Sequence, residues 1–153
     1  MLIFTIYPGP NMFLFFALAL TSVFASIENC GSTGLFTITE LKQDPDTTIQ
    51  PGQNVTLTLL YINGEVVTGG TVETAVTYNF IPYRPTRDDL CTSIVCPLDV
   101  GQHDGSVTYP FPSDIIGTII TQIKWFDTND NLLLCIKSTL KTANKPYKSL
   151  YPL

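Results

Sequence analysis

The four cysteines are the residues whose spacing says most about chemistry. Cys91 and Cys96 enclose four residues and are followed by Pro97, whereas Cys30 and Cys135 stand far from them and from each other. An even number of cysteines in a small secreted domain predicts two disulfides, for which three connectivities are possible. Cys91 and Cys96 form the easiest local pair, which leaves Cys30 for Cys135. Zinc ligation is the rival interpretation, but the two outer cysteines do not form a second close pair.

Groups that could perform catalysis are few. The only histidine, His103, lies next to Asp104 in G-Q-H-D-G, where the flanking glycines predict a loop. A histidine beside an acid is not a catalytic triad without a placed nucleophile. Asp88 and Asp89 share a charged stretch with Arg87, which favours solvated or ion-paired side chains. The motifs of serine hydrolases, phosphate loops and zinc proteases are missing. We therefore predict a protein that is not an enzyme and holds neither a metal nor a cofactor.

The beginning of the chain resembles a targeting segment. Residues 1–27 carry no charge, and the apolar run Met12–Ala25 is shorter than the ~20 residues that cross a bilayer. We predict a signal peptide over residues 1–25, cleaved before Ser26, with either Met1 or Met12 as the start. An uncleaved anchor is the alternative. Cleavage implies a secreted protein or one of the endosomal or lysosomal lumen.

Charge and a modification motif limit the partners. The net charge is −5 at pH 7, whereas a nucleic-acid-binding protein needs a basic footprint, so no nucleic-acid partner is expected. Asn54-Val55-Thr56 is an N-glycosylation sequon, and Asn54 is the predicted glycan site. The simpler interpretation is an ordinary strand-edge asparagine. A monomer is expected.

Short stretches of alternating apolar and polar residues predict strands, and no segment after residue 25 keeps a helical period. The expected strands cover residues 34–41, 54–62, 72–80, 105–111, 118–127 and 132–140. Turn residues separate them, and Asn63-Gly64 predicts a type I′ hairpin. This pattern is typical of an all-β, immunoglobulin-like antiparallel β-sandwich of about seven strands over residues 26–141. Residues 142–153 are expected to form a basic tail outside the sandwich.

Proline-rich edges indicate where the sandwich stays open. Proline cannot donate a hydrogen bond to a sheet, so residues 81–85 and 110–116 interrupt strand pairing while they carry aromatic and aliphatic side chains. Two such interruptions at one end are expected to hold the sheets apart. Apolar side chains that alternate inward then surround a lipid cavity between the sheets.

The sequence after Cys91 resembles a known family. The segments are C-T-S-I-V-C-P-L, T-Y-P-F-P, I-T-Q-I-K-W-F-D and N-L-L-L-C. Together they resemble the ML (lipid-recognition) domain family, which includes sterol carriers, group 2 mite allergens, phosphatidylglycerol/phosphatidylinositol transfer proteins and a lipopolysaccharide co-receptor. The resemblance extends from Cys30 to about Leu140. It implies the same disulfides, Cys30–Cys135 and Cys91–Cys96.

The resemblance also suggests site residues. Tyr83 lies where the sterol carrier has a pocket-lining aromatic, and Phe111-Pro112 matches the family's F-P segment, with Ile115 and Ile116 near the mouth. Alternation contributes the others. The predicted lipid-binding residues are Leu57, Leu59, Tyr61, Val76, Tyr78, Tyr83, Phe111, Pro112, Ile115, Ile116, Ile123 and Trp125.

The function implied by the resemblance is non-enzymatic lipid binding and transfer. The ligand is expected to be a sterol, a phospholipid or a fatty acid, loaded and delivered through transient contact with a membrane. The alternative is a secreted interaction or co-receptor module that recognises a protein partner or presents lipid to it.

Overall fold

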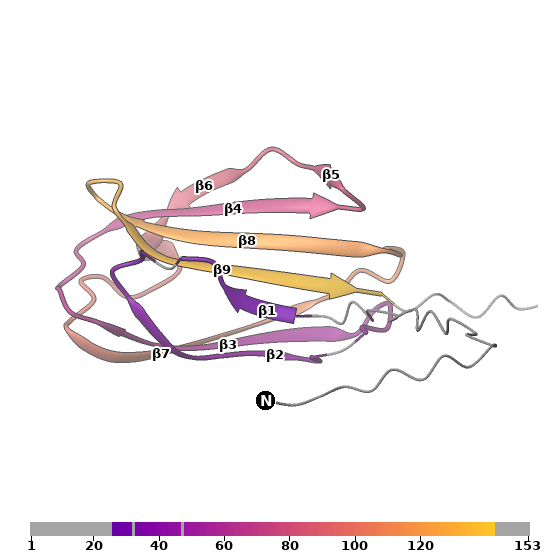
Figure 1. The fold of residues 1–153 in the computed structure, drawn as a ribbon, viewed down its shortest axis with the longest axis horizontal. Helices are drawn as coiled ribbons and strands as arrows, with labels where there is room; N and C mark the ends of the chain where they lie inside the picture. The colour runs from indigo at the N-terminus through magenta and orange to yellow at the C-terminus, as the bar shows by residue number, and fades with distance from the viewer. Residues whose placement is uncertain (1–25, 32, 47, 143–153) are drawn as a thin grey trace, which may run out of the picture.

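A computed structural model describes residues 26–31, 33–46 and 48–142. The predicted signal peptide and the tail after Thr142 lie outside the described residues. Nine strands and one short 3-10 turn make up two layers (Figure 1). They are β1 (Ser26–Asn29), β2 (Thr37–Asp44), β3 (Asn54–Asn63), β4 (Gly70–Tyr78), β5 (Ile81–Pro82), β6 (Thr86–Asp89), η1 (Leu90–Thr92), β7 (Gly101–Pro110), β8 (Thr118–Asp127) and β9 (Leu132–Lys141).

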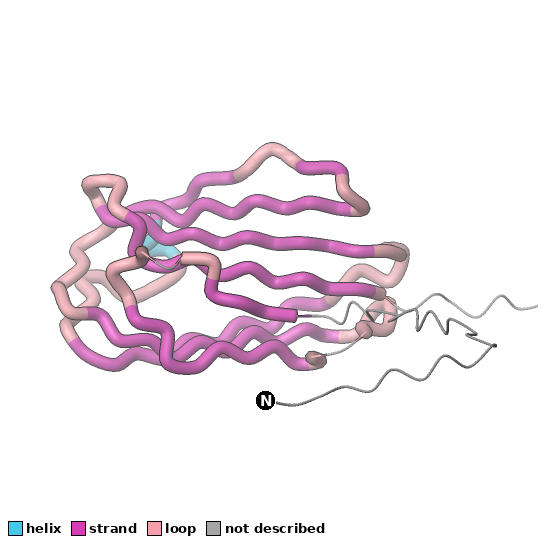
Figure 2. The backbone as a smooth tube through the Cα atoms, viewed as in Figure 1, coloured by secondary structure: helices cyan, strands magenta, loops and turns pink. Residues whose placement is uncertain are grey.

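The strands form two antiparallel sheets that pack face to face. The larger sheet has the order β1-β9-β8-β4-β5, with β6 also paired to β4, and the smaller sheet has the order β2-β3-β7. Figure 2 shows that nearly all of the described chain is strand or connecting loop, with the 3-10 turn as a single short piece. The predicted antiparallel β-sandwich is therefore confirmed.

Alternation along β3 shows why these residues make a sandwich. Val55, Leu59 and Tyr61 are buried, while the residues between them are more exposed. Successive side chains of a strand point to opposite faces, so the apolar ones all reach the other sheet. The prediction that the alternate apolar side chains of this strand face inward is therefore correct.

The predicted hairpin at Asn63-Gly64 is wrong. β3 pairs with β2 and β7 in one sheet, whereas β4 belongs to the other, so the connection crosses between layers. The buried Asn63 side chain donates to the carbonyl oxygens of Glu65 and Asp99, both at 2.8 Å, and accepts from the Gly101 N–H at 3.1 Å. These bonds fix a sheet-to-sheet crossing, which a local turn signal does not distinguish from a hairpin.

Two loops of the sequence interpretation are strands. His103 lies within β7 and not in a loop. The charged stretch before Cys91 contains β6, which covers the edge of β4, and Arg87 pairs there with Glu73 at 2.9 Å.

The two ends of the domain also differ from the prediction. The first strand, β1, was not predicted, and Thr142 is buried and bonded to Gly117 instead of belonging to an outer tail. Short or charged edge strands lack the apolar alternation that reveals longer ones.

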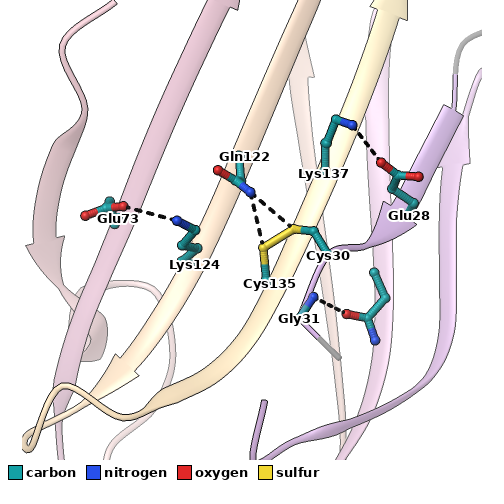
Figure 3. Close-up of a disulfide and its surroundings, with 9 residues drawn as sticks. Glu28, Cys30, Gly31, Glu73, Gln122, Lys124, Cys135 and Lys137 are labelled. Carbon is teal, nitrogen blue, oxygen red and sulfur yellow. Dashed lines mark hydrogen bonds and ion pairs between the residues drawn. A yellow bond between two sulfur atoms is a disulfide. The ribbon is translucent and has the colours of Figure 1, made fainter. Parts of the chain in front are cut away.

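Both predicted disulfides are formed. Cys30–Cys135 joins the loop after β1 to β9, and Cys91–Cys96 closes the loop that begins at η1. Figure 3 shows the Gln122 side chain of β8 directed at the first bridge, with its amide nitrogen 3.6 Å from each sulfur. The longer bridge thus ties the first strand to the central part of the larger sheet.

A polar pair divides the core into two apolar clusters. The first cluster is centred on Leu59, Tyr61 and Leu134, and the second on Ile49, Val55, Phe111 and Leu140. Between them, Ser138 of β9 donates a hydrogen bond of 2.6 Å to the Oε1 atom of Gln43 on β2, and both residues are buried. This bond joins the two sheets on the β1–β2 side of the sandwich.

We expect Ser138→Ala to lower the free energy of unfolding by about 1–3 kcal/mol, because the Gln43 carbonyl oxygen loses its partner in a buried place. The double change Gln43→Leu with Ser138→Ala should recover part of this loss, since neither polar group then remains. Urea unfolding of the purified variants measures both. Thr108→Val is the control: it removes the exposed 2.9 Å hydroxyl pair with Thr56, and a loss as large as that of Ser138→Ala contradicts the expectation.

Candidate functional site

The inner side of β7, the edge strand of the smaller sheet, is incompletely covered. Register pairs place Gly105 opposite Leu59 and Val107 opposite Leu57, so both β7 residues face inward with these leucines. A Cβ atom added to Gly105 would meet no heavy atom within 4 Å. Val107 is 53% exposed although it faces the other sheet. An inward apolar side chain with half of its surface in water shows that the facing sheet does not cover it here.

The opposite wall is the inner face of β4 and β8. Val76 pairs with Thr121 and Tyr78 with Ile119, and all four side chains are half-buried. Ile119 packs at the margin of the second cluster, whereas Val76, Tyr78 and Thr121 belong to neither cluster. The residues that face the open stretch of β7 are thus mostly apolar and incompletely packed.

The structure separates the predicted lipid-binding residues into four groups. Leu59, Tyr61, Ile123 and Trp125 lie in or against the first cluster, and Leu57, Phe111 and Ile115 lie in or against the second. Val76 and Tyr78 lie between the clusters. Tyr83, Pro112 and Ile116 are exposed. The role of these residues in lipid binding stays a prediction.

Aromatic packing closes one end of the space. Tyr61 stacks on Phe36 with ring centroids 5.2 Å apart and meets the edge of Trp125 at 5.8 Å. The His103 ring lies 5.6 Å from Tyr61, and its Nε2 atom is 2.7 Å from the Asp99 carbonyl oxygen. Edge-to-face and offset ring pairs add to the burial of apolar surface. This group joins the two sheets and leaves the open stretch on the Gly105 side.

Sequence reasoning missed His103 and Gly105. Both belong to an inward row, His103-Gly105-Val107-Tyr109, that continues the alternation of β7. The glycines at positions 101 and 105 favoured a loop around His103, so the strand expected at 105–111 was not extended back to it. Continuing the alternation of every second residue from Tyr109 back toward His103 would have revealed this inward row.

The two buried tyrosines of this interior are uncharged at neutral pH. Burial, and after it the negative charge of Asp104, raises the pKa of Tyr61, and burial raises the pKa of Tyr109. Both phenols are therefore protonated at neutral pH and present no charge to an apolar ligand. Within the described ranges, no three His, Cys, Asp or Glu side chains are grouped so that they could hold a metal ion.

Two hollows lie away from the predicted site. One of about 490 Å³ borders β1 and the end of β2, and is lined by Ile27, Leu41 and Gln43 among others. Another of about 370 Å³ lies at the crossing between β3 and β4, next to Gly64 and Val67. None of the predicted lipid-binding residues lines either hollow, so a test of ligand binding has to distinguish them from the space beside Gly105.

Two loops meet at the end of the sandwich where β4 stops. The Asn79 side chain accepts from the Thr118 N–H at 2.8 Å and donates to the Ile116 carbonyl at 3.3 Å. The Tyr78 hydroxyl donates to the same carbonyl at 2.9 Å. These bonds hold the β4–β5 turn against the β7–β8 loop (Figure 1).

Comparison with known proteins identifies relatives. The ML domain family model matches residues 25–142. A Dictyostelium discoideum protein with the provisional name phosphatidylglycerol/phosphatidylinositol transfer protein is 35% identical over 130 residues, which cover 80% of this chain and 92% of that protein.

Solved structures share the fold at low identity. A Niemann-Pick type C2 protein from Japanese carpenter ant superposes with a TM-score of 0.59 at 16% identity, over 77% of this chain and 99% of the ant chain. Chicken MD-1 complexed with lipid IVa superposes with a TM-score of 0.54 at 12% identity, over 77% of this chain and 88% of the chicken chain.

Proposed function

The chain belongs to the ML-domain family of lipid-binding proteins, and from that premise we propose that it binds one membrane lipid between its two sheets and transfers it. The observation that carries this is the inward side of β7, where Gly105 faces open space and Val107 is half exposed. The lipid tails lie between this strand and the half-buried wall of β4 and β8. The protein acts as a carrier without catalysis, as a monomer.

The driving force is the removal of apolar surface from water. Each methylene group buried in an apolar site is worth about 0.8 kcal/mol. A bilayer offers the same tails nearly the same environment, so the free energies of the two places almost cancel. Such a balance allows the protein both to load a lipid and to release it.

A phospholipid is the favoured ligand, with a sterol as the second. The relative that is 35% identical carries the name of a phospholipid transfer protein, which supports the first choice. A headgroup would remain at the mouth formed by the β4–β5 turn and the β7–β8 loop. The two disulfides are typical of oxidising compartments, which supports secretion or delivery to the endosomal or lysosomal lumen. Asn54 at the exposed start of β3 is a position that a glycan can occupy.

Gly105→Leu is expected to reduce lipid uptake about tenfold or more while the protein remains folded, because the loss of one or two buried methylene contacts already costs a factor of this size. A Cβ at this position meets no heavy atom within 4 Å, so we expect the fold to tolerate the substitution. Delipidated protein is titrated with a fluorescent phospholipid and with a fluorescent sterol, and thermal unfolding is followed in parallel.

Gly64→Leu is the matched control, since a Cβ there also meets nothing within 4 Å but the residue lines the distant hollow at the β3–β4 crossing. It should bind both lipids like the parent. A loss of uptake in Gly64→Leu with normal uptake in Gly105→Leu would move the ligand to that hollow. A parent protein that takes up neither lipid would favour the alternative of an interaction module.

A further inference from the structure

The tip of the β4–β5 turn carries an aromatic residue in a conformation that aromatic residues avoid. Tyr78 pairs with Ile81, so Asn79 and Phe80 form a two-residue hairpin loop, with φ values of 45° and 69°. Positive φ at both positions defines a type I′ turn, which favours Asn followed by Gly. Asn79 matches this preference, but Phe80 occupies the glycine position. A bulky side chain at positive φ is a backbone outlier that folding alone does not explain.

The Phe80 ring contributes nothing visible to packing. It is 89% exposed, and its neighbours Ile81, Tyr83 and Ile116 are also exposed. The Asn79 side chain holds Ile116 of the β7–β8 loop beside the turn through the two bonds to Thr118 and Ile116. Two loop tips therefore present one apolar patch, next to the Tyr78–Ile119 end of the inner wall.

We infer that this tip, formed by Phe80, Ile81, Tyr83 and Ile116, inserts into the surface of a phospholipid bilayer while lipid is exchanged. The inference rests on the proposed function and names its partner. A strained, exposed aromatic at a turn tip lowers stability, which fits a residue retained for an interaction.

The shape and charge of the patch favour a bilayer over a protein. Stable protein interfaces bury on the order of 1,200–2,000 Å², which four side chains on two loop tips cannot supply. A single aromatic with aliphatic neighbours is enough to enter the headgroup region of a membrane. Residues 79–83 carry no charge and the chain carries −5, so insertion of apolar groups, and not attraction to anionic lipid, must drive docking. Arg84 and Asp114 flank the tip with opposite charges.

The test uses the purified protein and phosphatidylcholine vesicles in a co-sedimentation assay. The parent should bind the vesicles, and raising the ionic strength should not release it. Phe80→Gly should weaken binding about tenfold, since the ring supplies much of the inserted surface. The same variant should unfold at an equal or higher temperature, because glycine fits the turn. Weaker binding together with unchanged or increased stability supports the inference in a way that a merely structural role of Phe80 does not reproduce.

Val95→Gly is the control, since Val95 is 84% exposed in the Cys91–Cys96 loop outside the patch. It should bind vesicles like the parent. Phe80→Gly that binds like the parent, or parent binding that high salt abolishes, would overturn the inference. Sedimentation velocity that shows a dimer of the parent and a monomer of Phe80→Gly would also overturn the inference, because the tip would then bind a second copy of the chain.

Uptake of a fluorescent phospholipid without vesicles separates the two proposals. This comparison is made on the parent protein, because the β4–β5 turn that carries Phe80 also forms the proposed mouth. A parent that docks on vesicles but takes up no lipid would refute the carrier function and leave the docking surface in place. A parent that takes up lipid but does not dock would refute the docking surface alone.

Discussion

Replacing Cys30 and Cys135 together by alanine is expected to lower the free energy of unfolding by about 4 to 5 kcal/mol, the largest effect of any change considered. The bridge spans a sequence separation of 105, so its removal releases most of the unfolded chain from one long closed loop. Alanine suits the buried position of Cys135, where a serine hydroxyl would need a partner. Urea unfolding of the variant and the parent under non-reducing conditions measures the difference.

The second disulfide provides the comparison. Cys91–Cys96 has a sequence separation of only 5, and the same chain-entropy relation gives about 2 kcal/mol for Cys91→Ala with Cys96→Ala. If the short-loop variant loses as much stability as the long-loop variant, loop closure is not the source of the stabilisation. Peptide mapping of both variants should show that the remaining bridge is still formed.

Tyr61→Ala is expected to lower the free energy of unfolding by about 3 kcal/mol or more, because it leaves a cavity where three rings meet. The side chain, on β3, is 2% exposed and packs against Phe36, which precedes β2, and against Trp125 on β8 of the other sheet. The ring contact between the two sheets in the first cluster would therefore be lost. Thermal and urea unfolding quantify the loss.

Tyr83→Ala is the matched control for the same truncation. Tyr83 is exposed at the predicted mouth, and the structure shows only its backbone N–H bonded, to the Val76 carbonyl at 2.8 Å. It should unfold like the parent within about 0.5 kcal/mol, as surface changes usually do. Its effect should appear in lipid binding, where a fluorescent phospholipid and sterol should both bind more weakly. A stability loss in Tyr83→Ala equal to that of Tyr61→Ala would contradict the assignment of one ring to the core and the other to the mouth.

The sequence by itself determined the sandwich and its covalent ties. Alternation at Val55, Leu59 and Tyr61 is a local signal with a period of two, and it survives whatever the strand pairs with. The short spacing of Cys91 and Cys96 indicated their bond, which left Cys30 for Cys135, and the family resemblance implied the same two bridges. The strands and the Cys91–Cys96 bridge depend on residue type and short spacing, whereas Cys30–Cys135 followed from the even number of cysteines and the family resemblance.

The tertiary structure decided what depends on the partner of each strand. Asn63-Gly64 has the composition of a hairpin, but buried hydrogen bonds to the Asp99 and Gly101 backbone turn it into a crossing between sheets. The expected strand at 105–111 begins after His103, and only the pairing of β7 with β3 shows that the strand starts earlier and turns His103 toward the interior. Val107 stays half exposed because the facing sheet does not cover that part of β7. Such a gap is a property of two surfaces brought together by the fold, and no single stretch of sequence encodes it.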